Sequence, residues 1–294
     1  MTKEDLNKIL EKHKLWLYGE EGGQRANFQD ADLKGIDFSD VDLRSANFKS
    51  ANLSNANLSG ANLMDAILRT ADLTNVNLKC ADIRGANLIK AYLSHADLTN
   101  ANLRYVDLSY ANLTNANLRY ADLRDVRLIH ANLRNTVFID SDVRNADLSF
   151  ANLAEANFIN AYLCNANFRN ANLRNANLRG TDLAGANLRN ANFVNADLTD
   201  ADLRNADLRD VILTHADLRG ANIDFSCLPL WCGSLSANFD DTQLIQIAYH
   251  LVRAGLKSKN ASDETKEELS KLIDFANKFH RVYECGKIVK DGEQ

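Results

Sequence analysis

Residues 96–125 read ADLTN ANLRY VDLSY ANLTN ANLRY ADLRD, a row of five-residue units. The same pattern, A-[D/N]-[L/F]-x-x, runs from residue 26 to residue 225, forty units without an insertion or a deletion. So regular an internal period indicates a repeat architecture in which each unit packs on its neighbours. We therefore expect residues 26–225 to fold as one solenoid.

Each position of the unit has its own composition. The third is Leu, Phe, Ile or Val in all forty units and the first is Ala in 31, so both are predicted to fill the core. The fifth is Gly, Asn or Asp in 26 units, and these residues tolerate the dihedral angles of turns. A period of five matches neither a helix nor the alternation of a long strand. It predicts a short extended piece and a bend in every unit, and the absence of Pro from the array leaves all main-chain N–H groups free to bond between coils.

On this motif the array resembles the bacterial pentapeptide-repeat family. The resemblance implies an all-β solenoid, a right-handed quadrilateral parallel β-helix in which four units form one square coil. Forty units then give about ten coils, and residues twenty apart lie above one another. Positions one and three point inward, and the other three point to solvent.

The two ends of a solenoid expose core and unpaired main-chain groups, so caps are expected there. Residues 1–25 are predicted to form a capping helix and a linker, with Thr2 as the helix N-cap. Residues 226–294 are predicted to form a loop and a subdomain of two helices.

The two C-terminal helices are predicted over Asp241–Leu256 and from Ser262 to about Tyr283. The segment that begins at Ser226 resembles a tail of uncharacterised family members, and the resemblance implies no activity. The tail is either a cap, an interface between copies of the chain, or a site for a separate partner. The apolar residues expected on its packed helix faces are Leu244, Ile247, Ala248, Leu251, Leu269, Leu272, Ile273, Ala276 and Phe279.

Charge and composition argue against several classes of function. The net charge of −5 and the pI of about 5.7, with no strongly basic segment, argue against direct nucleic-acid binding. No run of residues is apolar enough for a membrane span, and Met1–Gly19 lacks the features of a signal peptide, so we expect a cytoplasmic protein without membrane contact. The five cysteines are scattered and are expected to be reduced thiols, although Cys227 and Cys232 leave a redox pair open.

Residues arranged for catalysis are not evident. The six histidines belong to separate segments, and the three in the array do not converge in a frame of twenty residues. Asp and Asn occupy the second position of 34 units and are expected to belong to the motif rather than to a carboxylate pair. We predict no catalytic, cofactor-binding or metal-binding residue, no cofactor and no enzymatic activity.

One column of outward residues becomes visible when coils of twenty residues are stacked. Arg occupies the fourth position of one side in four consecutive coils, and an Asp precedes three of them by two residues, at Asp82, Asp122 and Asp142. Either a solvated salt-bridge ladder or a docking site for an anionic partner explains this pattern. The candidate charged ladder is Arg84, Arg104, Arg124 and Arg144.

A second column lies at a corner, where successive fifth positions are Lys90, Tyr110, His130 and Phe150. Clustered exposed aromatic residues are typical of protein-binding surfaces. Stacking of these side chains on one another, or cover by the C-terminal helices, is the alternative explanation. The candidate partner-binding residues are Tyr92, Tyr110, His130, Phe150, Ile89 and Ile129.

These features predict a non-catalytic protein-interaction scaffold whose protein partner the sequence does not identify. The resemblance supplies an alternative, because some family members mimic B-form DNA and protect or inhibit DNA gyrase. Basic residues nearly balance acidic ones across this array, which does not suit such a mimic. A third possibility is a structural rod that self-assembles, with a homo-oligomer formed through the C-terminal helices.

Overall fold

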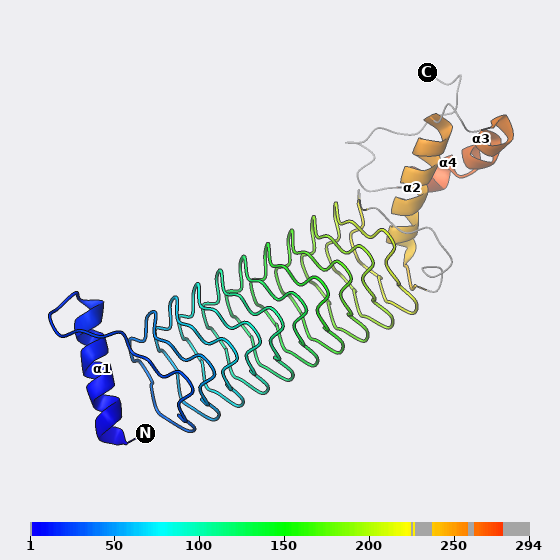
Figure 1. Cartoon of the computed structure of the whole chain (residues 1–294). Coiled ribbons are helices and arrows are strands. Elements are labelled where there is room, and N and C mark those ends of the chain that lie inside the picture. The colour runs from blue at the N-terminus through cyan, green and yellow to red at the C-terminus, as the bar shows by residue number, and fades with distance from the viewer. Residues whose placement is uncertain (1, 225, 227–236, 258–261, 279–294) are drawn as a thin grey trace.

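The computed structural model describes residues 2–224, 226, 237–257 and 262–278. It is an elongated rod of stacked coils (Figure 1). Helix α1 (Lys3–Leu17) lies at one end of the rod. Helices α2 (Asp241–Lys257), α3 (Asp263–Ser270) and α4 (Ile273–Ala276) lie at the other.

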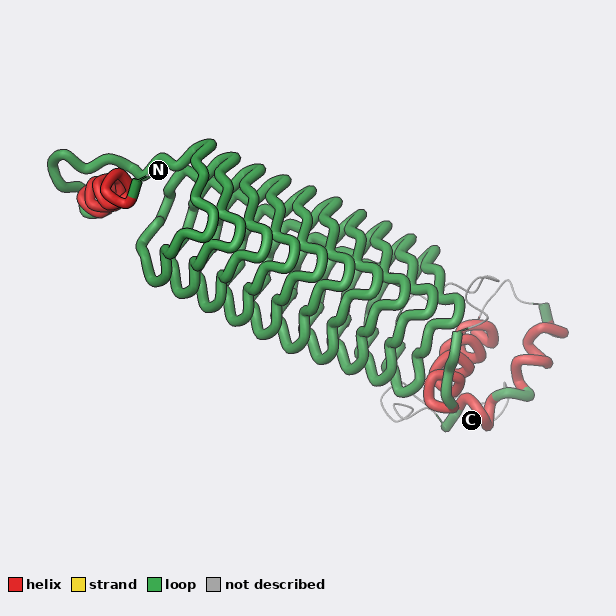
Figure 2. The backbone as a smooth tube through the Cα atoms, turned by 90° about the horizontal axis from the view of Figure 1, so that it is seen from below, coloured by secondary structure: helices red, strands yellow, loops and turns green. Residues whose placement is uncertain are grey.

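Each coil of the rod takes twenty residues. Parallel bridges join residues twenty apart, from Asn27 with Asn47 to Asp202 with Asn222. In the first bridge Phe28 N–H donates to the Asn47 carbonyl at 2.7 Å, and Asn47 N–H donates to the Ala26 carbonyl at 3.0 Å. The extended piece of each unit is so short that the described part of the rod contains isolated bridges and no longer strand (Figure 2).

The fifth residue of each unit makes the bend. Every fifth-position residue from Asp30 to Gly220 has a positive φ, between 56° and 73°. The turn is closed by a main-chain hydrogen bond, such as that from Ala31 N–H to the Phe28 carbonyl at 3.1 Å. Gly, Asn and Asp adopt this left-handed conformation readily, whereas other side chains raise its cost to about 1–2 kcal/mol. This explains the composition of the fifth position.

The second residue of each unit stabilises the same turn. Its side-chain oxygen accepts a hydrogen bond from the main-chain N–H two residues later, as Asn57 Oδ1 does from Ser59 at 3.2 Å. An Asn at this position also bonds between coils, as Asn77 Nδ2 does to Asn57 Oδ1 at 2.9 Å. Local hydrogen bonding therefore accounts for the recurrence of Asp and Asn.

The first and third positions fill the interior, in the way the sequence predicts. From Ala46 to Ala221 none of these residues is more than 1% exposed. Three first positions hold buried hydroxyl groups instead of Ala or Val, and each hydroxyl donates to a main-chain carbonyl, which satisfies it in an apolar core. These residues are Thr136, Ser141 and Thr181.

Helix α1 begins where the sequence predicts. Thr2 Oγ1 accepts a hydrogen bond from Asp5 N–H at 3.1 Å, and the Asp5 carboxylate accepts one from Thr2 N–H at 3.4 Å, which makes a capping box. On the side of the helix that faces the rod, Leu6 is buried, and Ile9 and Leu10 pack against the core.

The repeat ladder continues beyond the end predicted from sequence. Residues 227–236 lie outside the described part of the chain, and after them Ala237-Asn238-Phe239 repeats the motif. Asn238 bridges to Asp217, exchanging main-chain hydrogen bonds of 2.8 Å with the residues beside it, and Asp240 Oδ2 accepts from Gly220 N–H at 2.6 Å. The motif at residues 237–239 was the signal for this extra unit, and the count that stops at 225 omitted it.

The packed face of α2 differs from the expected one. Leu244 and Leu251 are 44% and 48% exposed, so their placement on a packed face was wrong, while Gln243 and Gln246 are buried. Gln243 Nε2 donates to the Ala221 carbonyl at 2.8 Å, and Gln246 Oε1 accepts from a main-chain N–H of the last coil at 3.2 Å. The end of the rod presents unpaired main-chain groups, so the helix that meets it needs amides there rather than leucines.

The second predicted C-terminal helix is interrupted. Helices α3 and α4 are separated by Lys271 and Leu272, whose N–H groups bond to carbonyls three residues earlier. Ile273 and Ala276 pack with Tyr249 and Val252 of α2, as the expected subdomain requires, whereas Leu272 is 43% exposed. The remainder of the predicted helix, including Phe279, lies outside the described residues.

The contact between α1 and the first coil depends on a neutral histidine. His13 is 1% exposed, and its Nδ1 accepts a hydrogen bond from Ala26 N–H at 3.1 Å. Burial lowers the pKa of this imidazole below its usual value of 6.5, and the charges of Arg44 and Arg25 act in the same direction, against that of Asp42.

We expect α1 to loosen from the rod in acid. Because the folded-state pKa of His13 is lowered, its contribution to stability is complete above about pH 6.5 and is lost as the pH falls through the folded-state value. Hydrogen-exchange protection factors of the α1 amides should fall between pH 7.5 and pH 5. In His13→Phe, which leaves the Ala26 N–H without its acceptor at a cost of about 1–3 kcal/mol, protection should be low at both pH values. Equal pH dependence in this variant and the wild type would contradict the assignment.

Candidate protein-docking site

Three exposed rings form a continuous stack along one corner of the rod. The ring centres of Tyr110 and His130 are 5.0 Å apart with an interplanar angle of 17°, and those of His130 and Phe150 are 4.8 Å apart with an angle of 22°. The three residues occupy the same place in successive coils, where Tyr110 is 56% and Phe150 49% exposed. The coil spacing itself therefore stacks the rings and leaves their edges in solvent. We call these three residues the aromatic corner.

The other predicted partner-binding residues have different surroundings. Ile89 and Ile129 are half-buried and share a column beside the aromatic corner with Ser109 and Ser149, which are buried. Tyr92 is 55% exposed on the next side of the rod. It forms no ring contact with the aromatic corner among those of the described residues, and instead borders a hollow of about 320 Å³ that contains Asp72 and Thr70.

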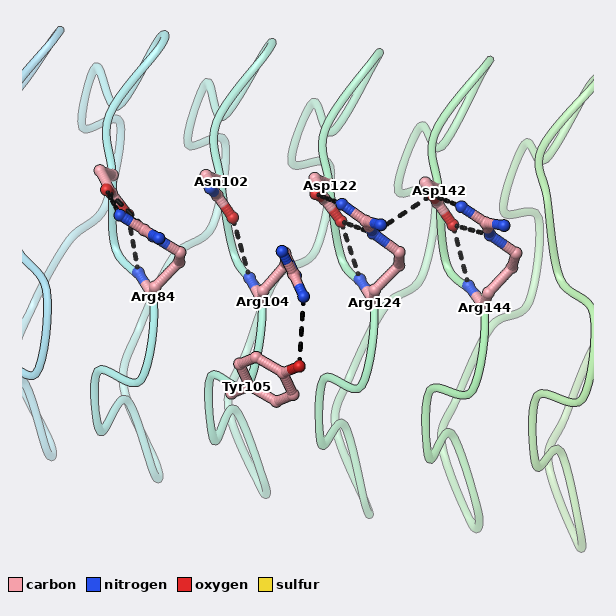
Figure 3. Close-up of polar contacts among 9 residues, drawn as sticks. Arg84, Asn102, Arg104, Tyr105, Asp122, Arg124, Asp142 and Arg144 are labelled. Atoms are coloured by element: carbon pink, nitrogen blue, oxygen red, sulfur yellow. Dashed lines mark hydrogen bonds and ion pairs between the residues drawn. The ribbon is translucent and has the colours of Figure 1, made fainter.

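The arginine column forms a ladder of ion pairs at three of its four positions (Figure 3). Each of these guanidinium groups bonds the carboxylate two residues earlier through Nε and Nη2, with Nη2···Oδ2 distances of 2.5–2.6 Å. Arg124 Nε also lies 3.4 Å from the carboxylate of Asp142 in the next coil. The paired residues are Arg84 with Asp82, Arg124 with Asp122, and Arg144 with Asp142.

Arg104 breaks this ladder because Asn102 stands where the other coils have Asp. Its guanidinium turns toward Tyr105, donating to the phenol oxygen at 3.2 Å, as Figure 3 shows. Its buried Nε has no hydrogen-bond partner among the described residues. The pairing of each arginine thus follows the residue at position two of its own unit.

A hollow of about 270 Å³ lies beside this ladder and was not predicted from sequence. Tyr120 and Tyr162 flank it, 58% and 54% exposed, and Asp122, Asp140 and Asp142 line it. The signal for it was the unusual Tyr at position two in unit 161–165, but the hollow also needs a corner residue two coils below. Only the coil geometry relates these positions.

A family model described as pentapeptide repeats matches residues 24–60, 51–88, 81–119, 121–158, 151–190 and 191–228. The chain belongs to the pentapeptide-repeat family. Membership, together with the parallel ladder of period twenty, identifies the rod of this pentapeptide-repeat protein as a right-handed quadrilateral β-helix.

Several solved structures are similar to this pentapeptide-repeat protein. HetL, involved in heterocyst differentiation regulation in the cyanobacterium Nostoc sp. strain PCC 7120, is 35% identical over 72% of this chain and 94% of its own, with a TM-score of 0.39. A pentapeptide repeat protein of the Arabidopsis thaliana thylakoid lumen is 38% identical over 34% of this chain and 69% of its own, with a TM-score of 0.33. A trypsin-treated form of QnrB1, a plasmid-mediated fluoroquinolone resistance protein, is 16% identical over 75% and 95%, with a TM-score of 0.40. No curated protein matches the chain.

The structure describes two thiols, Cys80 and Cys164, and neither forms a disulfide. Burial, with the Asp182 carboxylate 2.7 Å from its Sγ, raises the pKa of the Cys164 thiol to about 12, so it stays protonated at neutral pH. Cys80 is a free thiol. The proposed redox pair of Cys227 and Cys232 lies outside the described residues.

Two other kinds of feature are absent from the part of the chain that the structure describes. It contains no group of three or more His, Cys, Asp and Glu side chains placed to hold a metal ion. No helix in it is long and apolar enough to cross a membrane.

The ion-pair ladder predicts a titration that can be measured. Hydrogen bonds from Arg84 hold the pKa of the Asp82 carboxyl below its usual value of 3.8, against the opposing effect of partial burial. The stabilisation by this pair is therefore complete above about pH 3.8 and is lost as the pH falls further. In Arg84→Lys, which cannot form the two parallel bonds, carboxyl NMR should show a rise in the Asp82 pKa, with a change in Tm of only about 1–3 °C at pH 7.

Arg104→Lys is the matched control, since Asn102 has no carboxyl group to titrate. It should leave the pKa of Asp82 unchanged. An Asp82 pKa that does not respond to Arg84→Lys would contradict the pairing.

Proposed function

We propose that this pentapeptide-repeat protein is a non-catalytic scaffold that binds a protein partner through the aromatic corner. The observation that carries the proposal is the stack of Tyr110, His130 and Phe150, which exposes aromatic edges across three successive coils. Exposed clusters of aromatic residues are enriched at protein-binding surfaces, where they supply much of the binding energy.

The backbone conformation of the aromatic corner supports a role beyond the fold. Tyr110, His130 and Phe150 have φ values of 62°, 57° and 60°, in the left-handed region that bulky side chains adopt at a cost. The same column holds Asn170 and Asn190 in later coils, which suit this conformation better. Self-stacking of the rings offsets part of the cost, yet it leaves about half of each terminal ring exposed.

The described helices do not cover the aromatic corner. Helix α1 packs on the first coil and α2 on the last, at opposite ends of the rod (Figure 1). By their residue numbers the three rings belong to coils between these ends. Cover by the C-terminal helices, the alternative raised by the sequence, therefore has no support from the described residues.

The interior of the solenoid is filled with side chains, which leaves no enclosed site for a reaction within the coils.

Mimicry of DNA has weaker support. The 200 residues of the array carry 20 Lys and Arg against 24 Asp and Glu, whereas duplex DNA carries one negative charge about every 1.7 Å of its length. Many acidic side chains of the rod are neutralised by arginines within their own unit. Their charge is not available to imitate phosphates.

We further propose that the chain divides into a cap at 1–25, a solenoid at 26–225 and a segment at 226–294, which adds one more ladder bridge at Asn238 and then forms a helical subdomain. The hydrogen bond between His13 and Ala26 supports the first cap, and those of Gln243 and Gln246 to the last coil support the second. Both ends of the ladder are thus occupied, so joining rods end to end would require α1 or α2 to move away. Self-assembly would instead use a lateral surface, for example the exposed Leu244 and Leu251 of α2.

Replacing Tyr110 and Phe150 by Asn tests the scaffold proposal. The double variant Tyr110→Asn/Phe150→Asn should reduce affinity capture of the partner from cell extract at least about tenfold, because it removes both terminal rings of the stack. Its Tm should be unchanged or up to about 3 °C higher, since Asn suits a positive φ better than an aromatic residue does.

Tyr105→Asn/Tyr120→Asn is the matched control, because both tyrosines are exposed fifth-position residues with φ values of 62° and 58° outside the stack. It should keep full capture. Equal capture by both variants would remove the aromatic corner as the site. If the only protein captured is a further copy of this chain, self-association would replace binding of a separate partner as the proposed function.

A further inference from the structure

One side of the rod has a charge opposite to that of the chain. We define the basic face as the eight units that begin at residues 46, 66, 86, 106, 126, 146, 166 and 186, whose fifth positions include the aromatic corner. It carries six basic and two acidic side chains, a net charge of +4, in a chain of net charge −5. The acidic residues are Asp107 and Asp147, and the basic ones are Lys49, Arg69, Lys90, Arg127, Arg169 and Arg189.

Five of the six cations of the basic face lack the carboxylates that neutralise arginines elsewhere. On the other sides of the rod a unit with Asp at position two pairs its own Arg, as in Arg204 with Asp202 and Arg219 with Asp217. The units of Lys49, Arg69, Lys90, Arg169 and Arg189 have Asn or Ile at that position. No carboxylate of the described residues lies within ion-pair distance of these five cations, four of which are exposed and one of which is half-buried.

The two acidic residues of this face are already engaged. Asp107 lies 3.9 Å from Arg127, and its carboxylate accepts a hydrogen bond from Ser109 N–H. Asp147 accepts hydrogen bonds from Ser149 N–H and from Asn167 Nδ2, both at 3.0 Å. Within its eight units the face therefore offers cations without competing free carboxylates, and Arg189 at its end interacts electrostatically with a carboxylate of the next coil, that of Asp207.

The cations lie on both sides of the aromatic corner along the rod. Lys49, Arg69 and Lys90 occupy the three coils before Tyr110, and Arg169 and Arg189 occupy the two coils after Phe150. At about 4.8 Å per coil the face is roughly 34 Å long. A segment of about ten extended residues spans that length.

The geometry of the aromatic corner favours an acidic protein segment over a nucleic acid as the partner. Bases of single-stranded nucleic acid bind by stacking on aromatic faces. Here the inner faces of Tyr110 and Phe150 and both faces of His130 are occupied by the stack, which leaves two outer ring faces for stacking but presents the edges of all three rings along the corner. Ring edges carry the positive part of the aromatic quadrupole and attract carboxylates as well as apolar groups.

We propose that the basic face binds an extended acidic protein segment with interspersed apolar residues. Its carboxylates meet the cations at both ends, and its apolar side chains lie on the aromatic corner. This inference rests on the proposed scaffold function and names the chemical class of the partner. Charge complementarity of this kind mainly sets the rate of association and the choice of partner.

The test uses a fluorescein-labelled peptide, (Glu-Glu-Phe)4, with (Lys-Lys-Phe)4 and a twelve-nucleotide thymidine oligomer as comparison probes, in fluorescence anisotropy with the full-length protein. The acidic peptide should bind most tightly, and its affinity should fall steeply between about 50 and 500 mM salt because screening weakens exposed charge contacts. Arg169→Glu/Arg189→Glu should weaken its binding by at least about tenfold.

Arg119→Glu/Arg174→Glu is the matched control. Both arginines are exposed, follow an Asn at position two and lie on other sides of the rod without a carboxylate partner among the described residues. The control should lose less than about twofold. Equal losses in the two variants, or no binding of the acidic peptide, would overturn the inference, and preference for the thymidine oligomer would assign the face to nucleic acid instead.

The same probe separates this inference from the scaffold proposal. If Tyr110→Asn/Phe150→Asn keeps peptide binding while Arg169→Glu/Arg189→Glu loses it, the basic face stands and the aromatic corner does not. A second outcome is that the partner is captured through the aromatic corner but the acidic peptide binds neither the wild type nor the variants. The scaffold proposal would then hold, and the acidic class of partner would be wrong.

Discussion

The whole solenoid depends on one backbone constraint, the positive φ of the fifth residue in every unit. This residue turns the chain at each corner, so that four units close a coil. Each second-position residue then forms a parallel bridge with the residue twenty positions later. A unit that could not make the bend would displace all later residues from their partners in the neighbouring coil. This explains why the five-residue register runs unbroken from residue 26 to residue 225. The constraint also converts sequence distance into position, because a residue and the one twenty later are neighbours in space.

The surface follows from this conversion. A side chain repeated at intervals of twenty becomes a column, and its neighbours are set by the ladder rather than by loops. Columns of Asp and Asn accept hydrogen bonds from the N–H groups of the turns, and columns that contain both Asp and Arg form ion pairs. The rings of the aromatic corner stack because the coil spacing brings their centres to about 5 Å from one another. The proposed binding surface is thus a departure from columns that serve only the fold.

Much of this could be predicted from the sequence, and the parts that could not have a physical reason. The core positions and the N-cap at Thr2 follow from composition and period, whereas the aromatic column also needs the coil of twenty residues that the family resemblance implies. The buried faces of Gln243 and Gln246 do not, because their partners are main-chain groups exposed only once the last coil has formed. Arg104 forms no ion pair with a residue of its own unit because that unit has Asn102 in place of Asp. The positive charge of the basic face cannot be seen in the net charge of the chain, which is negative.

The scaffold function requires a partner protein that lies along the aromatic corner in the cell. The most direct measurement replaces His130 with the photoreactive residue benzoylphenylalanine, and Tyr120 with the same residue in a second strain, in the organism that makes the protein. On illumination we expect a covalent adduct from position 130, containing an acidic segment of another protein, and none from position 120. Adducts from position 120 alone, or none from position 130 while the protein is folded and expressed, would contradict the scaffold function.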